Sequence, residues 1–206
     1  MSSELEARYD AGAPKPDWIA VDWGTSHMRA WFMRGRRVVG RATSIEGMGT
    51  LEPEAFEDAL LRVLPVLDGP MPVMICGMAG SRQGWREAPY LTTPCRPPAG
   101  SRAVPVDTRD PRLSVRILPG VKQDDPADVM RGEETQIAGF LALNPGFDGI
   151  ICLPGTHSKW VHVSANELVS FRTFMTGELF ALLSRQSVLR HSIAEEGLDT
   201  DAFLAA

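Results

Sequence analysis

The chain has 206 residues, of which 44% are apolar and 23% charged, as in ordinary globular proteins of one or two domains. Its net charge of −5 excludes the broad basic surface that holds nucleic acid or anionic lipid. No apolar run is long enough to cross a membrane. Three widely spaced cysteines and four histidines lack the spacing of a zinc site or a disulfide framework, which favours a reducing, cytoplasmic compartment.

The first part of the chain predicts a small sheet. Residues 1–16 are polar and acidic and end in two closely spaced prolines, so we expect a disordered lead rather than a secretory signal. Three short apolar segments follow, with turn residues at Gly24 and at 34–36 between them. They predict an antiparallel meander of three strands over 18–22, 27–33 and 37–43.

The middle of the chain alternates helical and extended patterns. Apolar residues at helical spacing predict a helix over 53–67, which Pro65 ends or kinks. The segment 86–112 is rich in Pro, Arg and Thr and is expected to be a long surface excursion. Two further strands are predicted over 72–76 and 115–118, and a helix with an acidic first turn over 129–143.

The pattern of the first part then returns. The segment 147–163 reads as strand, Gly-Thr-His-Ser turn and strand; a third strand over 168–175 and a helix over 177–188 follow. This order matches the first meander and helix and indicates an imperfect internal repeat, although two hairpins with similar turns could coincide by chance. The elements predict a mixed α/β sheet flanked by helices. Two such units face to face would place both Gly-Thr turns on opposite walls of one cleft.

The first turn carries more polar groups than a hairpin needs. Gly24 allows close approach of the backbone, and Thr25 and Ser26 can donate to phosphate oxygens. Asp22, at a strand end, can orient Mg²⁺ through water. A purely structural turn is the alternative, and the second turn at 155–158 makes a two-sided phosphate site the stronger interpretation. GxxxxGK[ST] and GxGxxG are both absent, which excludes a P-loop and a dinucleotide fingerprint.

Five blocks in order along the chain point to a known family. They read VDWGTSHMRAW, GMAGSRQGW, VMRGEETQIAGF, LPGTHSKWVHV and FMTGELFALLSRQSVL. The sequence resembles the 2-dehydro-3-deoxygalactonokinase (2-keto-3-deoxygalactonate kinase) family, in the superfamily of sugar kinases, hexokinase, actin and heat-shock chaperones. The resemblance runs from about Trp18 to about Leu189.

The resemblance implies a fold and an activity. The fold would be RNase H-like (actin-like ATPase), with a first domain over 17–146 that holds the sugar-acid site and the first phosphate loop. Residues 147–206 would form the first part of a second domain, which holds the second phosphate loop and would be incomplete. The activity would be ATP- and Mg²⁺-dependent phosphorylation of the 6-hydroxyl of 2-dehydro-3-deoxy-D-galactonate in D-galactonate catabolism. Two alternatives stay open: a kinase for another sugar or sugar acid on this fold, and a non-catalytic actin-like nucleotide-binding protein.

The resemblance also implies roles for single residues. Asp22 would serve the metal. The phosphate loops would be Gly24, Thr25 and Ser26, and Gly155, Thr156, His157 and Ser158. Lys159 could add a cation, although a solvated strand lysine is an equal alternative.

The catalytic base should lie at a helix start before the second phosphate loop, where this superfamily usually has Asp. Here the segment holds two candidates, Glu133 and Glu134, and the motif leaves the choice open with a preference for Glu134. A helix N-terminus would keep such a carboxylate ionised, although acids favour the first turn of a helix in any case. The substrate would be a small-molecule sugar acid. Its carboxylate would bind Arg82, with Ser81 and Trp85 on the hydroxyls and carbon chain and Arg29 and Arg131 as secondary candidates.

The chain lacks a recognisable adenosine motif after the second phosphate loop. Members of the resembling family are longer than this chain. We therefore expect the chain alone to bind ATP weakly and to turn over slowly or not at all. Apolar surface in the terminal segment would favour homo-oligomer formation.

Overall fold

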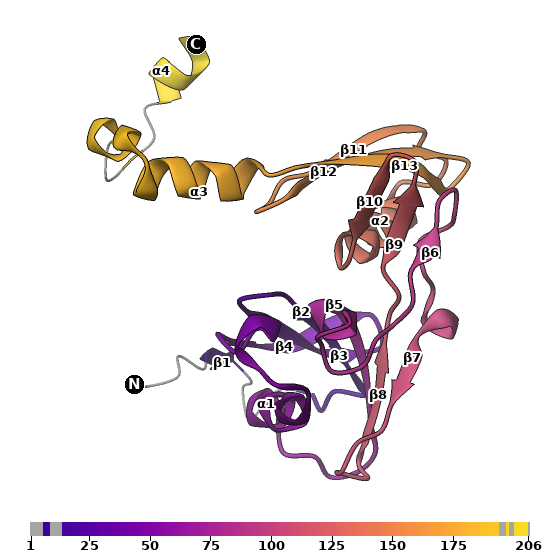
Figure 1. Ribbon diagram of the computed structural model, residues 1–206. Helices are drawn as coiled ribbons and strands as arrows, with labels where there is room; N and C mark the ends of the chain where they lie inside the picture. Colours follow the sequence, from indigo (N-terminus) through magenta and orange to yellow (C-terminus); the bar gives the residue numbers. More distant parts are fainter. Residues whose placement is uncertain (1–5, 9–13, 194–196, 198–199, 206) are drawn as a thin grey trace.

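The structure is a computed structural model, and it describes residues 6–8, 14–193, 197 and 200–205. The described chain forms three sheets, which Figure 1 shows as a lower body, a connecting ribbon and an upper sheet. The largest sheet has seven strands in the order β1-β4-β3-β2-β5-β8-β7. Its strands are β1 (Glu6–Arg8), β2 (Trp18–Trp23), β3 (Met28–Arg34), β4 (Arg37–Ser44), β5 (Met71–Gly77), β7 (Val104–Val106) and β8 (Leu113–Ile117).

The predicted meander is confirmed. Strand β3 pairs antiparallel with both β2 and β4. Strand β5 runs parallel to β2, and β8 parallel to β5, so the carboxyl ends of these three strands meet at one edge. Ligands of open α/β sheets commonly bind at such an edge.

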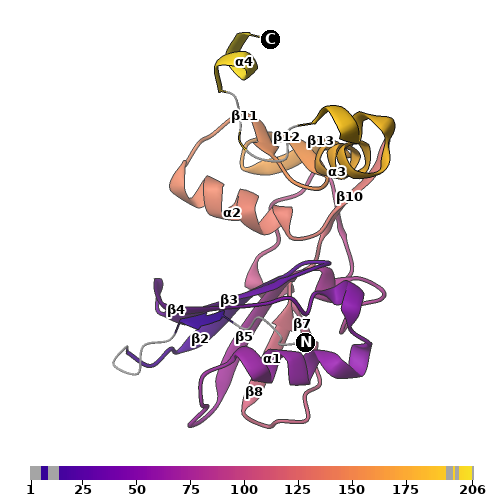
Figure 2. The ribbon, with the colours of Figure 1, turned by 90° about the vertical axis from the view of Figure 1, so that its left-hand side faces the viewer.

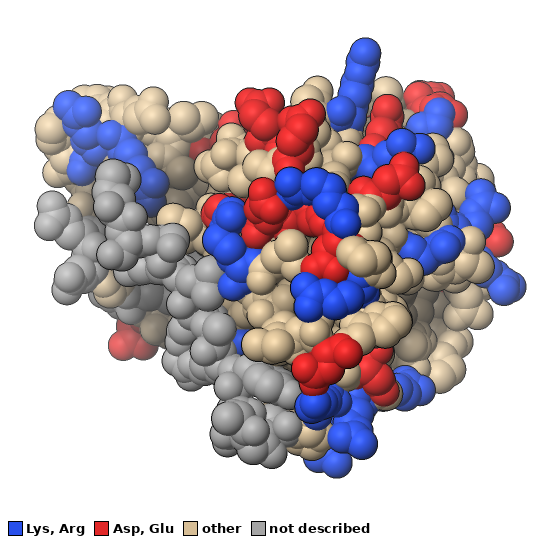
Figure 3. Space-filling model, turned by 90° about the horizontal axis from the view of Figure 1, so that it is seen from below, with Lys and Arg blue, Asp and Glu red and all other residues tan. Residues whose placement is uncertain are grey.

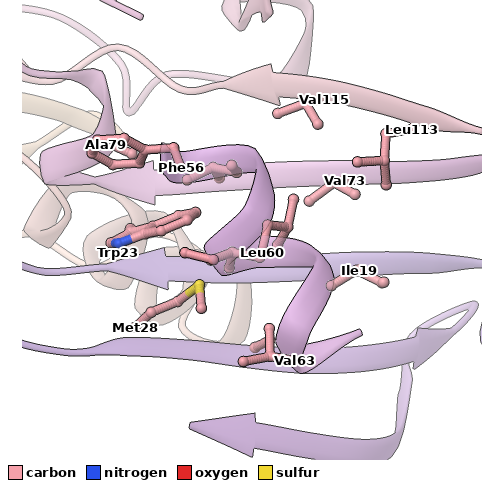
Figure 4. Packing of buried hydrophobic residues seen from close by; sticks show 14 of the residues in the cluster. Ile19, Trp23, Met28, Phe56, Leu60, Val63, Val73, Ala79, Leu113 and Val115 are labelled. Atoms are coloured by element: carbon pink, nitrogen blue, oxygen red, sulfur yellow. The ribbon is translucent and has the colours of Figure 1, made fainter. Parts of the chain in front are cut away.

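One face of this sheet is covered by helix α1 (Phe56–Val63), which follows the short helices η1 (Met48–Thr50) and η2 (Pro53–Ala55). Buried α1 side chains pack on alternate residues of β2, because successive strand side chains point to opposite faces. Figure 4 shows Phe56, Leu60 and Val63 lying over Ile19 and Trp23. The helix is shorter than predicted, since it ends at Val63, two residues before Pro65.

The predicted excursion contains short elements. These are β6 (Leu91–Thr92), η4 (Gly100–Arg102) and β7, and β7 closes one edge of the large sheet. Helix η3 (Met78–Gly80) directly follows β5.

The second sheet was not predicted. Strands β9 (Val121–Asp124) and β10 (Ala127–Met130) form an antiparallel hairpin, and β6 runs parallel to β9. The helix predicted over 129–143 therefore starts later, as α2 (Glu133–Leu143). Gly132 lies at φ +112°, a conformation that suits glycine and turns the chain from strand to helix.

The third sheet consists of β11 (Gly149–Leu153), β12 (Ser158–Ser164) and β13 (Glu167–Phe174), all antiparallel. This second meander and the helix after it are confirmed; the helix is α3 (Thr176–Gln186). Helices η5 (Val188–Ser192) and α4 (Thr200–Ala205) follow. Figures 1 and 2 both place α2 between the third sheet and the large sheet.

Two clusters of buried apolar side chains hold the molecule together. The first lies within residues 19–117, and the second within 121–171. Ile137 and Leu141 of α2 belong to the second cluster, so packing groups α2 with the third sheet. The domain division at residue 146 stays a prediction.

The disordered lead predicted over 1–16 is wrong for residues 6–8. These residues form β1, which pairs with β4 and satisfies backbone groups along that edge of the sheet. Residues 1–5 and 9–13 lie outside the described part of the chain.

The surface gives further limits. None of the described helices is long and apolar enough to cross a membrane. Figure 3 shows basic and acidic residues intermixed over the face seen from below, without a broad field of one sign there.

Candidate active site

Asp22 lies at the carboxyl end of β2, beside the end of β5. In the parallel pairing, Asp22 stands opposite Cys76 and Trp23 opposite Gly77. Its carboxylate is 31% exposed and lies 3.3 Å from Arg29 Nη1. Arg29 is therefore an ion-pair partner of the candidate metal-binding carboxylate in this structure.

The neighbouring strand reaches Asp22 only because it ends in glycine. Gly77 lies at φ +93°, and a Cβ there would stand 2.6 Å from the Trp23 carbonyl oxygen and 3.3 Å from Asp22 Oδ1. A side chain at this position would push against the carboxylate.

The first loop is supported by a segment that sequence reasoning missed. Gly24 donates to the His27 carbonyl at 2.9 Å, so this N–H closes the turn and does not face outward. The Gly49 N–H donates to the Thr25 carbonyl at 2.8 Å, and a Cβ at Gly47 would stand 2.3 Å from that oxygen. The side chains of Thr25 and Ser26 are exposed. They are the part of the predicted phosphate loop that a ligand can reach.

The N-terminus of α2 holds the two candidate bases in different environments. The Glu134 side chain is completely buried, and both of its oxygens accept from the Gly132 N–H, at 2.7 and 2.9 Å. Glu133 is half-buried and accepts from the Arg131 N–H at 3.0 Å. Glu134 is thus the more strongly desolvated of the pair.

Burial raises the pKa of Glu134 to about 8, and the hydrogen bond from the Gly132 N–H opposes this shift. The charge of Glu133 adds to the rise, and that of Arg131 lowers the pKa. The sequence led us to expect that the helix N-terminus keeps this carboxylate ionised, but burial shifts its pKa upward and outweighs the effect of the helix end.

Asp22 and the start of α2 line one cavity of about 430 Å³. Cys76 also lines this cavity. Burial raises the pKa of its thiol to about 12, and the charges of Asp22 and Glu134 add to the rise. Both carboxyl groups therefore act on the same thiol. The cavity is lined by Asp22, Arg29, Trp31, Cys76, Gly132, Thr135 and Gln136.

The second loop is clamped onto the start of α3. The Gly177 N–H donates to the Gly155 carbonyl at 3.2 Å, and the Glu178 N–H to the Thr156 carbonyl at 3.1 Å. The Ser158 hydroxyl is buried, contacts the Thr176 hydroxyl and accepts from the Gly155 N–H at 3.3 Å.

The exposed side chains of the second loop are Thr156 and His157, and His157 contacts the Glu178 carboxylate. None of the described hydrogen bonds joins this loop to the first one. The shared cleft for the two loops stays a prediction.

Lys159 points into the protein. Its side chain is 6% exposed, and its ammonium donates to the Val129 carbonyl and the Thr173 hydroxyl, both at 2.7 Å. Asp128 lies 4.0 Å away. These contacts tie β10 to the third sheet and give no support to the phosphate role predicted for this lysine.

The predicted substrate residues other than Arg29 separate into three environments. Arg82 is exposed. Trp85 stacks on Phe56, with ring centroids 6.0 Å apart, and belongs to the edge of the first core, which supports a packing role. Ser81 is buried, and the Arg131 guanidinium lies in the same region, against Gly80.

Sequence reasoning missed Cys76, Gly77 and Thr135 at this site. Cys76 directly precedes the GMAGSRQGW block, and Gly77 is the first residue of that block. The available signal was a glycine at the end of a predicted strand. The neighbourhood of Thr135 depends on the placement of α2, which local patterns do not fix.

The fold and the site together define a mixed α/β protein in which a strand-end carboxylate lies beside the N-terminus of a helix that carries a buried carboxyl group. Among known families, the model for 2-keto-3-deoxy-galactonokinase matches residues 22–206, and the chain belongs to this family. The resemblance drawn from the five sequence blocks is thereby confirmed.

Individual relatives agree with this assignment. The chain is 44% identical over 186 residues to a Rhizobium meliloti (strain 1021) protein described as a probable 2-dehydro-3-deoxygalactonokinase. It is 36% identical over 192 residues to the 2-dehydro-3-deoxygalactonokinase of Escherichia coli (strain K12). A crystal structure of a Sinorhizobium meliloti protein, provisionally described as a 2-dehydro-3-deoxygalactonokinase, superimposes with a TM-score of 0.75 at 42% identity. The superposition covers 87% of this chain and 60% of that one.

The two sequence alignments take in 86% and 91% of this chain, but 60% and 63% of the relatives. The chain therefore spans less than two thirds of the length of these relatives.

Proposed function

We propose that the protein is a cytoplasmic sugar-acid kinase that transfers the γ-phosphate of ATP to the 6-hydroxyl of 2-dehydro-3-deoxy-D-galactonate in D-galactonate catabolism. Family membership supports this reaction class, and the two relatives carry the corresponding name. We also infer an RNase H-like plan, because two antiparallel meanders are each followed by a helix.

One observation carries the proposal: the cavity that Asp22 shares with the start of α2, where Glu134 is buried. Phosphoryl transfer requires a group that takes the proton of the attacking hydroxyl and a carboxylate that places the metal-bound phosphates. The two carboxyl groups differ in exposure, which suits one for a proton and the other for a cation.

The residues present fit a magnesium ion that arrives with the nucleotide. The described chain has no cluster of three metal-ligating side chains. Mg²⁺ in kinases needs few protein ligands, since phosphates and water complete its octahedral shell. Asp22, partly exposed at the strand end, would hold it, and when bound it would neutralise charge on the phosphates.

Glu134 would act on the sugar hydroxyl. In its ionised form it would accept the hydroxyl proton as the oxygen bonds to the γ-phosphorus and ADP leaves. The Gly132 N–H and the Thr135 hydroxyl, at 3.5 Å from Oε1, would orient the carboxylate for this step. Thr25, Ser26 and Thr156 offer the exposed hydroxyls for the phosphates.

The test is ADP release from ATP by the chain at high protein concentration, with and without 2-dehydro-3-deoxy-D-galactonate, and phosphorus NMR of the product. We expect ADP release that depends on the sugar acid and a 6-phosphate product. Turnover of a neutral sugar alone would favour the broader sugar kinase. Calorimetric binding of ATP without turnover of any acceptor would favour the nucleotide-binding protein.

A further inference from the structure

Two buried side-chain atoms of the described chain have no hydrogen-bond partner: one belongs to the residue that follows Gly80, and the other lies against Gly80. They are Ser81 Oγ and Arg131 Nη1. Ser81 follows Gly80 directly, and a Cβ at Gly80 would stand 2.8 Å from Arg131 Nη1. Nearly all buried donors in folded proteins are paired, so two orphans at one place indicate a site for a partner.

The rest of the Arg131 guanidinium is already engaged. Nη2 donates to the Ala88 carbonyl at 2.9 Å, and Nε to the Tyr90 hydroxyl at 3.4 Å. The guanidinium carbon lies 4.2 Å from the centre of the Tyr90 ring. These contacts hold the group in place and leave Nη1 as its free donor, which is the arrangement of a preorganised recognition group.

The chemistry of the two donors selects an anion. One donor is a permanently charged guanidinium and the other a hydroxyl, and such a pair suits a carboxylate. The same Cβ position at Gly80 lies 2.8 Å from Ile117 Cγ2, so the surroundings are partly apolar and strengthen a charged hydrogen bond.

We propose that Ser81 Oγ and Arg131 Nη1 form the subsite that binds the carboxylate of the sugar-acid substrate. The inference rests on the proposed function and moves the carboxylate role from Arg82, which is exposed, to Arg131. Arg131 stands three residues before Glu134, so one short segment would carry both substrate recognition and the candidate base. Because both donor atoms are closed to solvent, the side chains that cover them must move when the carboxylate enters.

Calorimetry on the full chain tests the subsite without relying on turnover. The probes are 2-dehydro-3-deoxy-D-galactonate and its neutral carboxamide. Wild-type protein should bind the acid about tenfold or more tightly than the amide. Ser81→Ala and Arg131→Met should each weaken acid binding by about tenfold or more and leave amide binding nearly unchanged. Arg86→Met, an exposed arginine of the same segment, is the matched control and should bind the acid as wild type does.

Thermal unfolding supplies a second reading. Ser81→Ala removes a hydroxyl without an internal partner, so its Tm should equal or exceed that of wild type. A lower Tm would show that the hydroxyl has a structural partner and would overturn the subsite. Arg131→Lys keeps the charge and serves if the Met variant fails to fold; it should also bind the acid more weakly.

These measurements distinguish a failure of the proposed subsite from a failure of the proposed function. If wild type prefers the acid and both the Ser81 and Arg131 variants keep that preference, or if only Arg82→Met loses it, the subsite is wrong and the proposed function stands. If wild type neither binds nor phosphorylates the acid, both are wrong.

Discussion

The two adjacent glutamates of α2 show how burial separates residues that the sequence leaves equal. Both occupy the first turn of the helix, where acids are common for reasons of helix stability alone. Glu134 is fully buried and close enough to Cys76 for its charge to act on the thiol, whereas Glu133 is half-buried and bonded to the backbone of Arg131. We therefore propose Glu134, and not Glu133, as the group that takes the proton.

Glu134→Gln should lower kcat by about a hundredfold or more, because an amide cannot accept the hydroxyl proton. Glu133→Gln, the matched control one position away, should stay within about threefold of wild type. Wild-type kcat should rise with pH up to about 8, since the base must be ionised to act. Equal losses in both variants, or a flat profile from pH 6 to 9, would contradict this assignment.

Glu134 should also make folding stability depend on pH. Its pKa rises from 4.5 in the unfolded chain to about 8 when folded, so the folded state binds the proton more tightly. Its contribution is therefore fully present below pH 4.5 and is lost as pH rises through about 8. Glu134→Gln should remove this loss and raise the free energy of unfolding more at pH 8 than at pH 5.

Urea denaturation at the two pH values measures the effect. Glu133→Gln serves again as the control. If the Glu134→Gln variant gained no stability relative to wild type between pH 5 and 8, the carboxyl would not be desolvated as described.

At the scale of elements, local patterns predicted what local forces decide. Both meanders follow from apolar segments separated by turn residues, and α1 and α3 follow from helical spacing. The hairpin of β9 and β10 was missed, because QDDPADVM is polar and reads as a loop before a helix. Its strands are held by distant partners: Gln123 accepts from the Phe171 N–H at 2.9 Å, and Lys159 binds the Val129 carbonyl. Such contacts leave no trace in the local pattern.

The same limit applies to the site. Asp22 and the Glu133–Glu134 pair could be singled out from motif order, whereas the cavity that Asp22 shares with the start of α2 required the parallel pairing of β2 with β5. Lys159 and Trp85 were assigned to ligands by their neighbours in sequence, and packing directs both into the protein.

Gly77 lies at the end of β5, where this strand pairs with the end of β2 beside Asp22. Its replacement should lower the stability of the protein and disturb the site. Gly77→Ala places a methyl group 2.6 Å from the Trp23 carbonyl in a left-handed conformation, so we expect a loss of about 2 kcal/mol or more. Gly139→Ala, inside α2 with nothing within 4 Å of its Cβ position, should instead gain about 0.5–1 kcal/mol. Urea unfolding compares the two variants, and a Gly77→Ala protein as stable as wild type would refute the close approach of β5 to Asp22.

At the scale of the whole molecule, apolar side chains are packed in some parts of the described chain and exposed in others. The large sheet packs its apolar side chains against α1, as Figure 4 shows. Helix α3 instead extends away from the third sheet in Figure 1 and has no buried residue. It exposes apolar side chains in consecutive turns, at Leu179, Phe180, Leu182 and Leu183. Contiguous apolar patches on a protein surface promote association.

We therefore expect the chain to self-associate through α3 as its concentration rises. Phe180→Glu with Leu183→Glu places two charges three residues apart on one helical face and should shift the protein to a monomer. Val66→Glu is the matched control, because Val66 is 90% exposed, lies far from α3 in sequence and should not alter the association. Light scattering after size-exclusion chromatography over a tenfold or wider concentration range gives the mass directly. A wild-type monomer throughout that range would contradict the prediction, and equal dissociation by Val66→Glu would show that the association does not depend on α3.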